Sequence, residues 1–102
     1  MQKQKRTDFL NELFNIIDNQ AKKGNKKSYT KSLIKEGKKK IAQKVGEETT
    51  ELIIDYLNGS KKRVIEESSD LIYHLWVLLY SNNITLEDVT KELIKRHNVR
   101  QK

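Results

Sequence analysis

The sequence predicts an all-α protein, a helical bundle of four main helices plus a short helical turn. The chain contains no proline, and its four glycines stand apart from one another, so little interrupts long helices. Apolar residues recur at three- and four-residue spacing, and no segment shows the alternation of a strand. The length of 102 residues allows a single domain over 1–102, with basic tails at about 1–6 and 98–102.

The first two elements lie before Gly37. Apolar residues recur at helical spacing behind Thr7, a residue type that caps helices, so we expect a first helix over about 8–22. Two lysines followed by Gly24 mark its end. After a polar loop, residues 30–36 are predicted to form the short helical turn, which Gly37 closes.

A second long helix is expected from Lys38 to the turn at 58–59. Its apolar face is formed by Ile41, Val45, Leu52, Ile53 and Tyr56. The pattern fits a helix that buries one face against a neighbour.

Ser60 is expected to cap a third helix that runs to about Ser81. Its segment 75–80 is apolar on all sides, which indicates burial against more than one neighbour. A fourth helix opens at Thr85 with an acid three residues later, as in a capping box, and ends near His97. Because so short a chain buries a limited core, we expect a homodimer, with segment 75–80 as its candidate interface.

Composition narrows the classes of function. With 35% hydrophobic and 34% charged residues, no run approaches the roughly 18 apolar residues of a membrane span. The basic N-terminus lacks the apolar core of a signal peptide, so we expect a cytoplasmic protein without a membrane partner. The chain has no cysteine and two histidines, so a bound metal would be a hard ion on oxygen ligands.

The formal net charge of +7 allows two interpretations. Clustered lysines and arginines would neutralise the phosphates of a nucleic acid. Here the lysines are scattered over every segment, and a basic surface would equally attract a polyphosphate substrate. We expect no nucleic-acid partner, although charge alone does not separate the two cases.

Two acidic segments, GEETTE at 46–51 and EESSD at 66–70, carry acids three residues apart. At this spacing Glu48 shares a helical face with Glu51, and Glu67 shares one with Asp70. The simplest interpretation of either pair is an acidic stripe that faces solvent.

A helical wheel at about 100° per residue places Glu48 inside the apolar arc, about 20° from Ile41. Glu51, Glu67 and Asp70 fall along the edges of the apolar faces of their helices. Because the turn at 58–60 makes the two helices antiparallel, these acidic edges should converge.

Converging carboxylates repel one another, and burial raises the cost of their charge. A divalent cation offsets this directly, and the acids offer the all-oxygen ligands that Mg²⁺ accepts. Ion pairs from Lys44 or Arg63 are the alternative that needs no metal.

Four segments together resemble one enzyme family. They are SYTKSL at 28–33, GKKKIAQKVGEETTE at 37–51, EESSDLIYHLWVLL at 66–79 and LEDVTKELIKRH at 86–97. In order and spacing they resemble the phosphoribosyl-ATP pyrophosphohydrolases, which belong to the all-α, MazG-like nucleotide pyrophosphohydrolases. The similarity runs from about Phe9 to His97. It departs from the family pattern at Thr49-Thr50 and in the lysine-rich segment 18–27, which lacks proline.

The resemblance implies the roles of the acids. The family pattern EExxE followed by ExxD corresponds to the catalytic acids Glu47, Glu48, Glu51, Glu67 and Asp70. Four of them would ligate Mg²⁺: Glu48, Glu51, Glu67 and Asp70. Glu47 would bind a further metal or orient the attacking water.

The resemblance also implies a reaction, the Mg²⁺-dependent hydrolysis of 1-(5-phosphoribosyl)-ATP to 1-(5-phosphoribosyl)-AMP and pyrophosphate in the second step of histidine biosynthesis. Because some members are fused to a cyclohydrolase, and this chain is short and lacks cysteine, we expect the pyrophosphohydrolase step alone. Candidate residues for binding this nucleotide are Lys44, Lys38, Arg63, His74, Ser28 and Tyr29. Of these, Ser28 and Tyr29 rest on the family motif only, and His74 would either touch substrate or support Asp70.

Two alternatives remain. A house-cleaning pyrophosphohydrolase acting on NTPs or dNTPs would use the same metal site, and only the SYT and YH signatures argue against it. A basic, nucleic-acid-binding helical protein would treat the acids as surface residues, which does not explain the position of Glu48 in an apolar face.

Overall fold

The computed structural model describes residues 6–100, with the backbone alone at Arg100, and within that range it contains helices and no strand. The predicted all-α class is confirmed, and the short helical turn is a helix of two turns. The elements are η1 (Arg6–Asp8), α1 (Phe9–Lys23), α2 (Tyr29–Glu36), α3 (Lys38–Leu57), α4 (Lys61–Ser81) and α5 (Leu86–Arg100).

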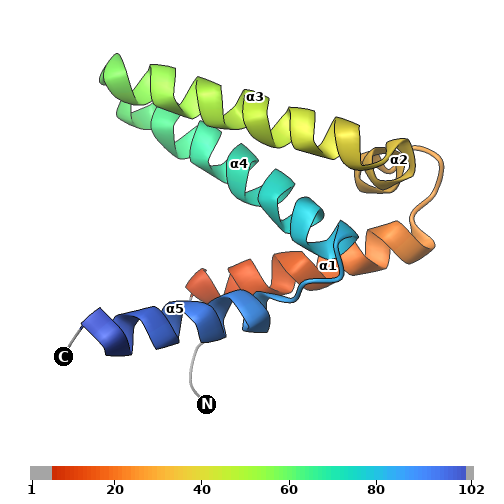
Figure 1. Cartoon of the computed structure of the whole chain (residues 1–102). Coiled ribbons are helices and arrows are strands. Elements are labelled where there is room, and N and C mark those ends of the chain that lie inside the picture. The colour runs from red at the N-terminus through yellow and green to blue at the C-terminus, as the bar shows by residue number, and fades with distance from the viewer. Residues whose placement is uncertain (1–5, 101–102) are drawn as a thin grey trace.

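An antiparallel pair of long helices, α3 and α4, dominates the molecule (Figure 1). They are joined by a tight turn in which Gly59 has a φ of 79°, a left-handed conformation that favours glycine. Ser60 then caps α4, because its hydroxyl oxygen accepts a hydrogen bond from the Arg63 amide. The turn therefore places the two acidic segments on facing helices.

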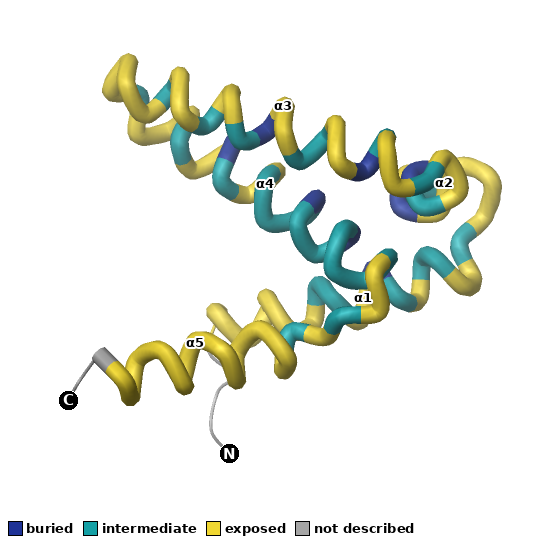
Figure 2. The backbone as a smooth tube through the Cα atoms, in the orientation of Figure 1, coloured by how far each residue is buried: buried dark blue, intermediate teal, exposed yellow. Residues whose placement is uncertain are grey.

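A second layer is formed by α1 and α5 at the C-terminal end of α4, and α2 packs against α1, α3 and α4 (Figure 1). The buried apolar core takes one residue from each of four helices, namely Ile17, Leu33, Ile41 and Val77. It lies where α1, α2, α3 and α4 meet, whereas α5 and the far end of the α3–α4 pair are exposed (Figure 2).

Several predicted helix ends are confirmed and two differ. The capping box at the start of α5 is present, since Thr85 and Asp88 exchange side-chain-to-backbone hydrogen bonds of 2.9 and 3.1 Å. Thr7 is not the cap of α1, because η1 extends the helical path by one turn and includes it. The fourth long helix continues past His97 to Arg100, and what is left of the predicted basic tails, 1–5 and 101–102, lies outside the described residues.

The predicted apolar face of α3 is wrong at its C-terminal end. Ile53 and Tyr56 are 52% and 71% exposed, because this end of α3 extends beyond α1 and α2. Segment 75–80 of α4 does pack against more than one neighbour. Within it, the Trp76 indole N–H donates to the Leu10 carbonyl of α1 at 2.8 Å.

No described helix meets the length and hydropathy that a transmembrane segment requires.

Leu33→Ala should destabilise the protein by about 2–5 kcal/mol, because Leu33 is 1% exposed and joins α2 to the core. Urea unfolding followed by circular dichroism at one fixed protein concentration would measure this loss. Ser32→Ala, an exposed change on the same helix, is the control and should cost less than about 0.5 kcal/mol. Equal losses in both variants would contradict the placement of the core.

Candidate metal centre

Three acids converge between α3 and α4. Ligand oxygens of Glu48, Glu67 and Asp70 all lie within 4.8 Å of one another. Glu48 and Glu67 are 8% and 4% exposed, whereas Asp70 is exposed at the rim. The antiparallel turn thus brings Glu48 of α3 to two acids of α4 that follow it by 19 and 22 positions, as the wheel positions predict.

The remaining two acids of the predicted site lie at different distances from this cluster. Glu51 is exposed one turn after Glu48, and its carboxylate is close enough to Glu67 to raise the pKa of that group. Glu47 is also exposed, and it accepts a hydrogen bond of 2.8 Å from the Gln43 amide of its own helix. The structure therefore brings Glu51 to the cluster and leaves Glu47 outside it.

The ion pairs that were the alternative to a metal are present. The Lys44 ammonium lies 3.8 Å from Oε1 of Glu48, one turn away on α3. The Arg63 guanidinium donates to Oε1 of Glu67 at 2.8 Å. Both cations therefore neutralise part of the charge that the cluster gathers.

Arg63 contacts two further carboxylates. Its guanidinium donates to Glu66 at 3.0 Å and lies 3.8 Å from Asp55 of α3. Asp55 first, and then the two glutamates, raise the pKa of Arg63, which keeps it charged. Arg63 thus links α3 to α4 beside the cluster.

The charged form of Glu67 remains unfavourable, although Arg63 is its ion-pair partner. Burial, followed by the neighbouring Glu51, raises its pKa from 4.5 to about 7, while Arg63 acts in the opposite direction and Asp70 adds to the rise. A hydrogen bond between the carboxyl groups of Glu51 and Glu67 requires a proton on one of them. When both are ionised, the buried Oε2 of Glu67 has no hydrogen-bond partner.

The unpartnered Oε2 atom of Glu67 indicates that a metal ion fits this site. A buried carboxylate oxygen without a donor is costly, and a cation supplies the missing partner. Opposite oxygen ligands of Mg²⁺ or Ca²⁺ stand about 4 to 5 Å apart, which matches the 4.8 Å spread of the three acids. The donor set of Glu48, Glu67 and Asp70, with Glu51 adjacent, therefore fits a hard divalent cation.

The SYT and YH segments meet beside the acids. The Tyr29 hydroxyl lies 3.0 Å from Nε2 of His74, and Nδ1 of His74 lies 2.8 Å from the Asp70 carbonyl oxygen. Because a carbonyl only accepts, Nδ1 carries a proton, and in the tautomer with its proton on Nδ1 the Nε2 atom accepts from Tyr29. Ser28 does not face this group, since its hydroxyl oxygen caps α2 by accepting from the Lys31 amide.

Two further residues of these segments pack beside the Tyr29–His74 contact and are not among the clustered acids. The hydroxyl groups of Thr30 and Tyr73 hydrogen-bond across the same α2–α4 contact, and the Tyr73 ring stacks on Tyr29 with centroids 6.1 Å apart. Their identities are visible in the sequence, but 43 residues separate them, and no periodicity within one helix shows that they meet.

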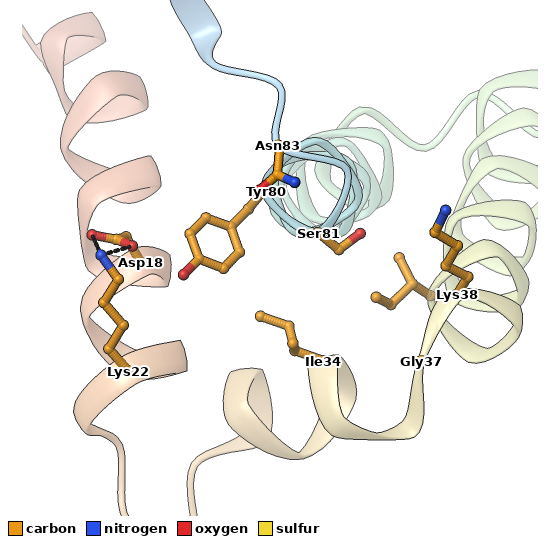
Figure 3. A pocket seen from close by; sticks show the side chains of 9 residues that line it. Asp18, Lys22, Ile34, Gly37, Lys38, Tyr80, Ser81 and Asn83 are labelled. Carbon is orange, nitrogen blue, oxygen red and sulfur yellow. Dashed lines mark hydrogen bonds and ion pairs between the residues drawn. The ribbon is translucent and has the colours of Figure 1, made fainter.

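Lys38 lies away from the acids. Ten residues of α3 separate it from Glu48, a rise of about 15 Å. It instead borders an open cavity of about 520 Å³ that none of the clustered acids lines (Figure 3). Across this cavity the ion pair of Asp18 with Lys22 faces Tyr80, and Lys22 lowers the pKa of Asp18.

Without a divalent cation, lowering the pH from 8 to about 5.5 should stabilise the protein. The native state keeps a proton on Glu67 up to about pH 7, whereas the unfolded chain releases it near 4.5, so the native state binds more protons in this window. The stabilisation is complete below about 4.5 and is lost as the pH rises through 7. Thermal unfolding in EDTA across this range would measure it.

Glu67→Gln is the control for this effect, because a neutral amide has no proton to lose. In EDTA at pH 8 the variant should melt at a higher temperature than the wild type, and the pH dependence attributed to Glu67 should disappear. An identical pH dependence in the two proteins would contradict the raised pKa.

The chain is similar over most of its length to proteins of one family. Residues 10–97 match the family model described as phosphoribosyl-ATP pyrophosphohydrolase. A phosphoribosyl-ATP pyrophosphatase of Sulfolobus acidocaldarius is 52% identical over 85% of this chain and 92% of its own length. One from Clostridium novyi is 44% identical over 87% and 81% of the two chains. A histidine biosynthesis bifunctional protein HisIE of Bacteroides thetaiotaomicron is 47% identical over 88% of this chain and 44% of its own, longer sequence. The chain that holds this acidic cluster belongs to the phosphoribosyl-ATP pyrophosphohydrolase family.

Proposed function

We propose that this protein hydrolyses 1-(5-phosphoribosyl)-ATP to 1-(5-phosphoribosyl)-AMP and pyrophosphate, with Mg²⁺ as its cofactor, in the second step of histidine biosynthesis. The observation that supports this most directly is the trio of carboxylates within 4.8 Å, which includes a buried oxygen without a partner, in a chain of this family. A nucleotide polyphosphate is a substrate that such a cation would bind.

Glu48, Glu67 and Asp70 would hold the cation, and Glu51 would complete its ligands. When bound, a divalent cation neutralises charge on phosphate oxygens and lowers the pKa of a ligated water. Lys44 would add positive charge beside the cluster, where its ammonium already faces Glu48. An acid at the rim, Glu51 or Glu47, would accept the proton of the attacking water, and both are exposed enough to reach it.

The other residues proposed to bind substrate differ in the partners they already have and in their distance from the acids. Arg63 is engaged by three carboxylates and would reach a phosphate only by leaving one of them. Lys38 lies too far along α3 to contact a phosphate held at Glu48. Among the basic side chains near the acids, Lys44 is therefore the one that we assign to the polyphosphate.

We also propose that 1–102 acts as a single domain in the cytoplasm. Its core takes residues from α1, α2, α3 and α4, so no smaller unit within 6–100 has a core of its own. The bifunctional relatives are named as proteins of histidine biosynthesis.

A homodimer is the assembly that we propose. The radius of gyration is 15.6 Å, whereas a compact chain of about 100 residues has one of about 13 Å. Large apolar side chains are more than half exposed at the far end of the α3–α4 pair, namely Ile53, Ile54, Tyr56, Leu57 and Ile65. A second copy would cover these clustered apolar side chains. Segment 75–80, the interface expected from the sequence, instead packs within the chain.

Purified protein with Mg²⁺ should release pyrophosphate from phosphoribosyl-ATP, and EDTA should abolish the release. Glu48→Gln and Glu67→Gln should each lower kcat/KM by more than about a hundredfold, because loss of even an outer partner of a metal ligand typically costs ten- to a hundredfold. Glu87→Gln, which removes an exposed acid of α5, should keep wild-type activity.

A panel of canonical NTPs and dNTPs, assayed in parallel, tests the substrate. Turnover of the whole panel at the rate seen for phosphoribosyl-ATP would show a house-cleaning enzyme. Full activity in both glutamine variants would refute the metal site itself.

Light scattering coupled to gel filtration should give the mass of two chains. Leu57→Lys, at a side chain that is 75% exposed, should shift the protein toward a single chain of 12.0 kDa, because a buried lysine opposes association. Lys62→Glu, on an exposed residue of the same end, is the control for a change of charge alone. A wild-type protein that elutes as a monomer at high concentration would contradict the assembly.

A further inference from the structure

Asp70 differs from the two buried acids in how its side chain is held. Glu48 is paired with Lys44, and Glu67 with Arg63. Among the described residues, the Asp70 carboxylate has no hydrogen bond or ion pair, and it is exposed. Its position therefore depends on the backbone turn of α4 to which it is attached.

That turn is held by His74. The ring lies one turn further along α4 and is 6% exposed, and its Nδ1–H donates to the Asp70 carbonyl oxygen at 2.8 Å. This carbonyl oxygen belongs to the same residue that bears the carboxylate. The hydrogen bond consequently restrains the carbonyl group bonded to the Cα atom from which the Asp70 side chain projects.

The ring of His74 is itself fixed from α2. The Tyr29 hydroxyl donates to Nε2 at 3.0 Å, and the two rings pack edge to face with centroids 5.8 Å apart. Tyr29 also stacks on Tyr73, which packs edge to face on His74. With both ring nitrogens engaged and the side chain buried, His74 has no free atom for a substrate.

We propose that Tyr29 and His74 are positioning residues, which hold the Asp70 carboxylate at the divalent-cation site through its own backbone carbonyl. The inference rests on the proposed function only in assuming that the cluster binds a divalent cation. It gives the contact between the SYT and YH segments a role in cation binding. Loss of a residue that hydrogen-bonds to a metal ligand typically weakens metal binding ten- to a hundredfold.

The test measures Mn²⁺ binding by electron paramagnetic resonance and Mg²⁺ binding by calorimetry, both without nucleotide. His74→Leu removes both hydrogen bonds and should weaken cation binding about tenfold or more. Tyr29→Phe removes only the hydroxyl and should have a smaller effect. His74→Asn places an amide donor near the position of Nδ1 and should recover part of the affinity that leucine loses.

Thr30→Val is the matched control, because it removes the Thr30–Tyr73 hydrogen bond across the same pair of helices without touching Asp70. It should lower the melting temperature and leave cation affinity unchanged. If Thr30→Val weakens cation binding as much as His74→Leu, the effect is one of general packing and the proposal is wrong. Tyr29→Phe and His74→Asn keep the test decisive if His74→Leu does not fold.

Kinetics separate positioning from substrate contact. At saturating Mg²⁺ the variants should keep the KM for phosphoribosyl-ATP, whereas a raised KM with unchanged Mn²⁺ affinity would overturn the proposal. A wild-type protein that binds Mn²⁺ more tightly than His74→Leu, yet does not hydrolyse phosphoribosyl-ATP, would refute the proposed function and leave this inference standing.

Discussion

The arrangement of α3 and α4 depends on how the protein tolerates like charges at a buried edge. Glu48 and Glu67 are almost fully buried on facing helices, with Asp70 beside them. Repulsion of this kind would push the helices apart if nothing opposed it. Lys44 and Arg63 each oppose it from one side. They leave one buried carboxylate oxygen of Glu67 without a hydrogen-bond partner. The centre of the α3–α4 pair therefore carries less positive than negative charge.

This shortage of positive charge between α3 and α4 connects the fold to the cation binding that we propose. The same desolvation that raises the pKa of Glu67 would strengthen its attraction to a divalent cation, because burial leaves less water to compete. A site of this kind sacrifices stability when it is empty and regains it when a cation binds. If the cluster binds a cation as proposed, the acids serve function at the expense of the stability of the isolated fold, as strained sites in proteins commonly do.

Much of this architecture follows from the sequence. Helical spacing, the absence of proline and the residues at the helix ends were enough to locate the helices, because these signals act over one or two turns. The wheel position of Glu48 was also sufficient to predict its burial. The exposure of Ile53 and Tyr56 could not be predicted in this way, because periodicity shows which face is apolar but not whether a neighbour covers it.

The contact of α2 with α4 could not be predicted from the sequence, because periodicity does not show which helices become neighbours. Tyr29 and His74 are 45 residues apart, and their pairing depends on the path of the chain through α3. The sequence placed Tyr29 in the site through the family motif and His74 through its position one turn after Asp70, and the structure shows His74 hydrogen-bonded to the Asp70 carbonyl oxygen and to Tyr29.

The composition of the core has a consequence for dynamics. Each of α1, α2, α3 and α4 supplies one buried apolar residue, so none of these helices can detach without opening the core of the others. Amide protons in these four helices should therefore exchange with solvent together, as one cooperative unit. No residue of α5 is buried among its described side chains, so this helix can fray and re-form on its own while the rest of the chain stays folded.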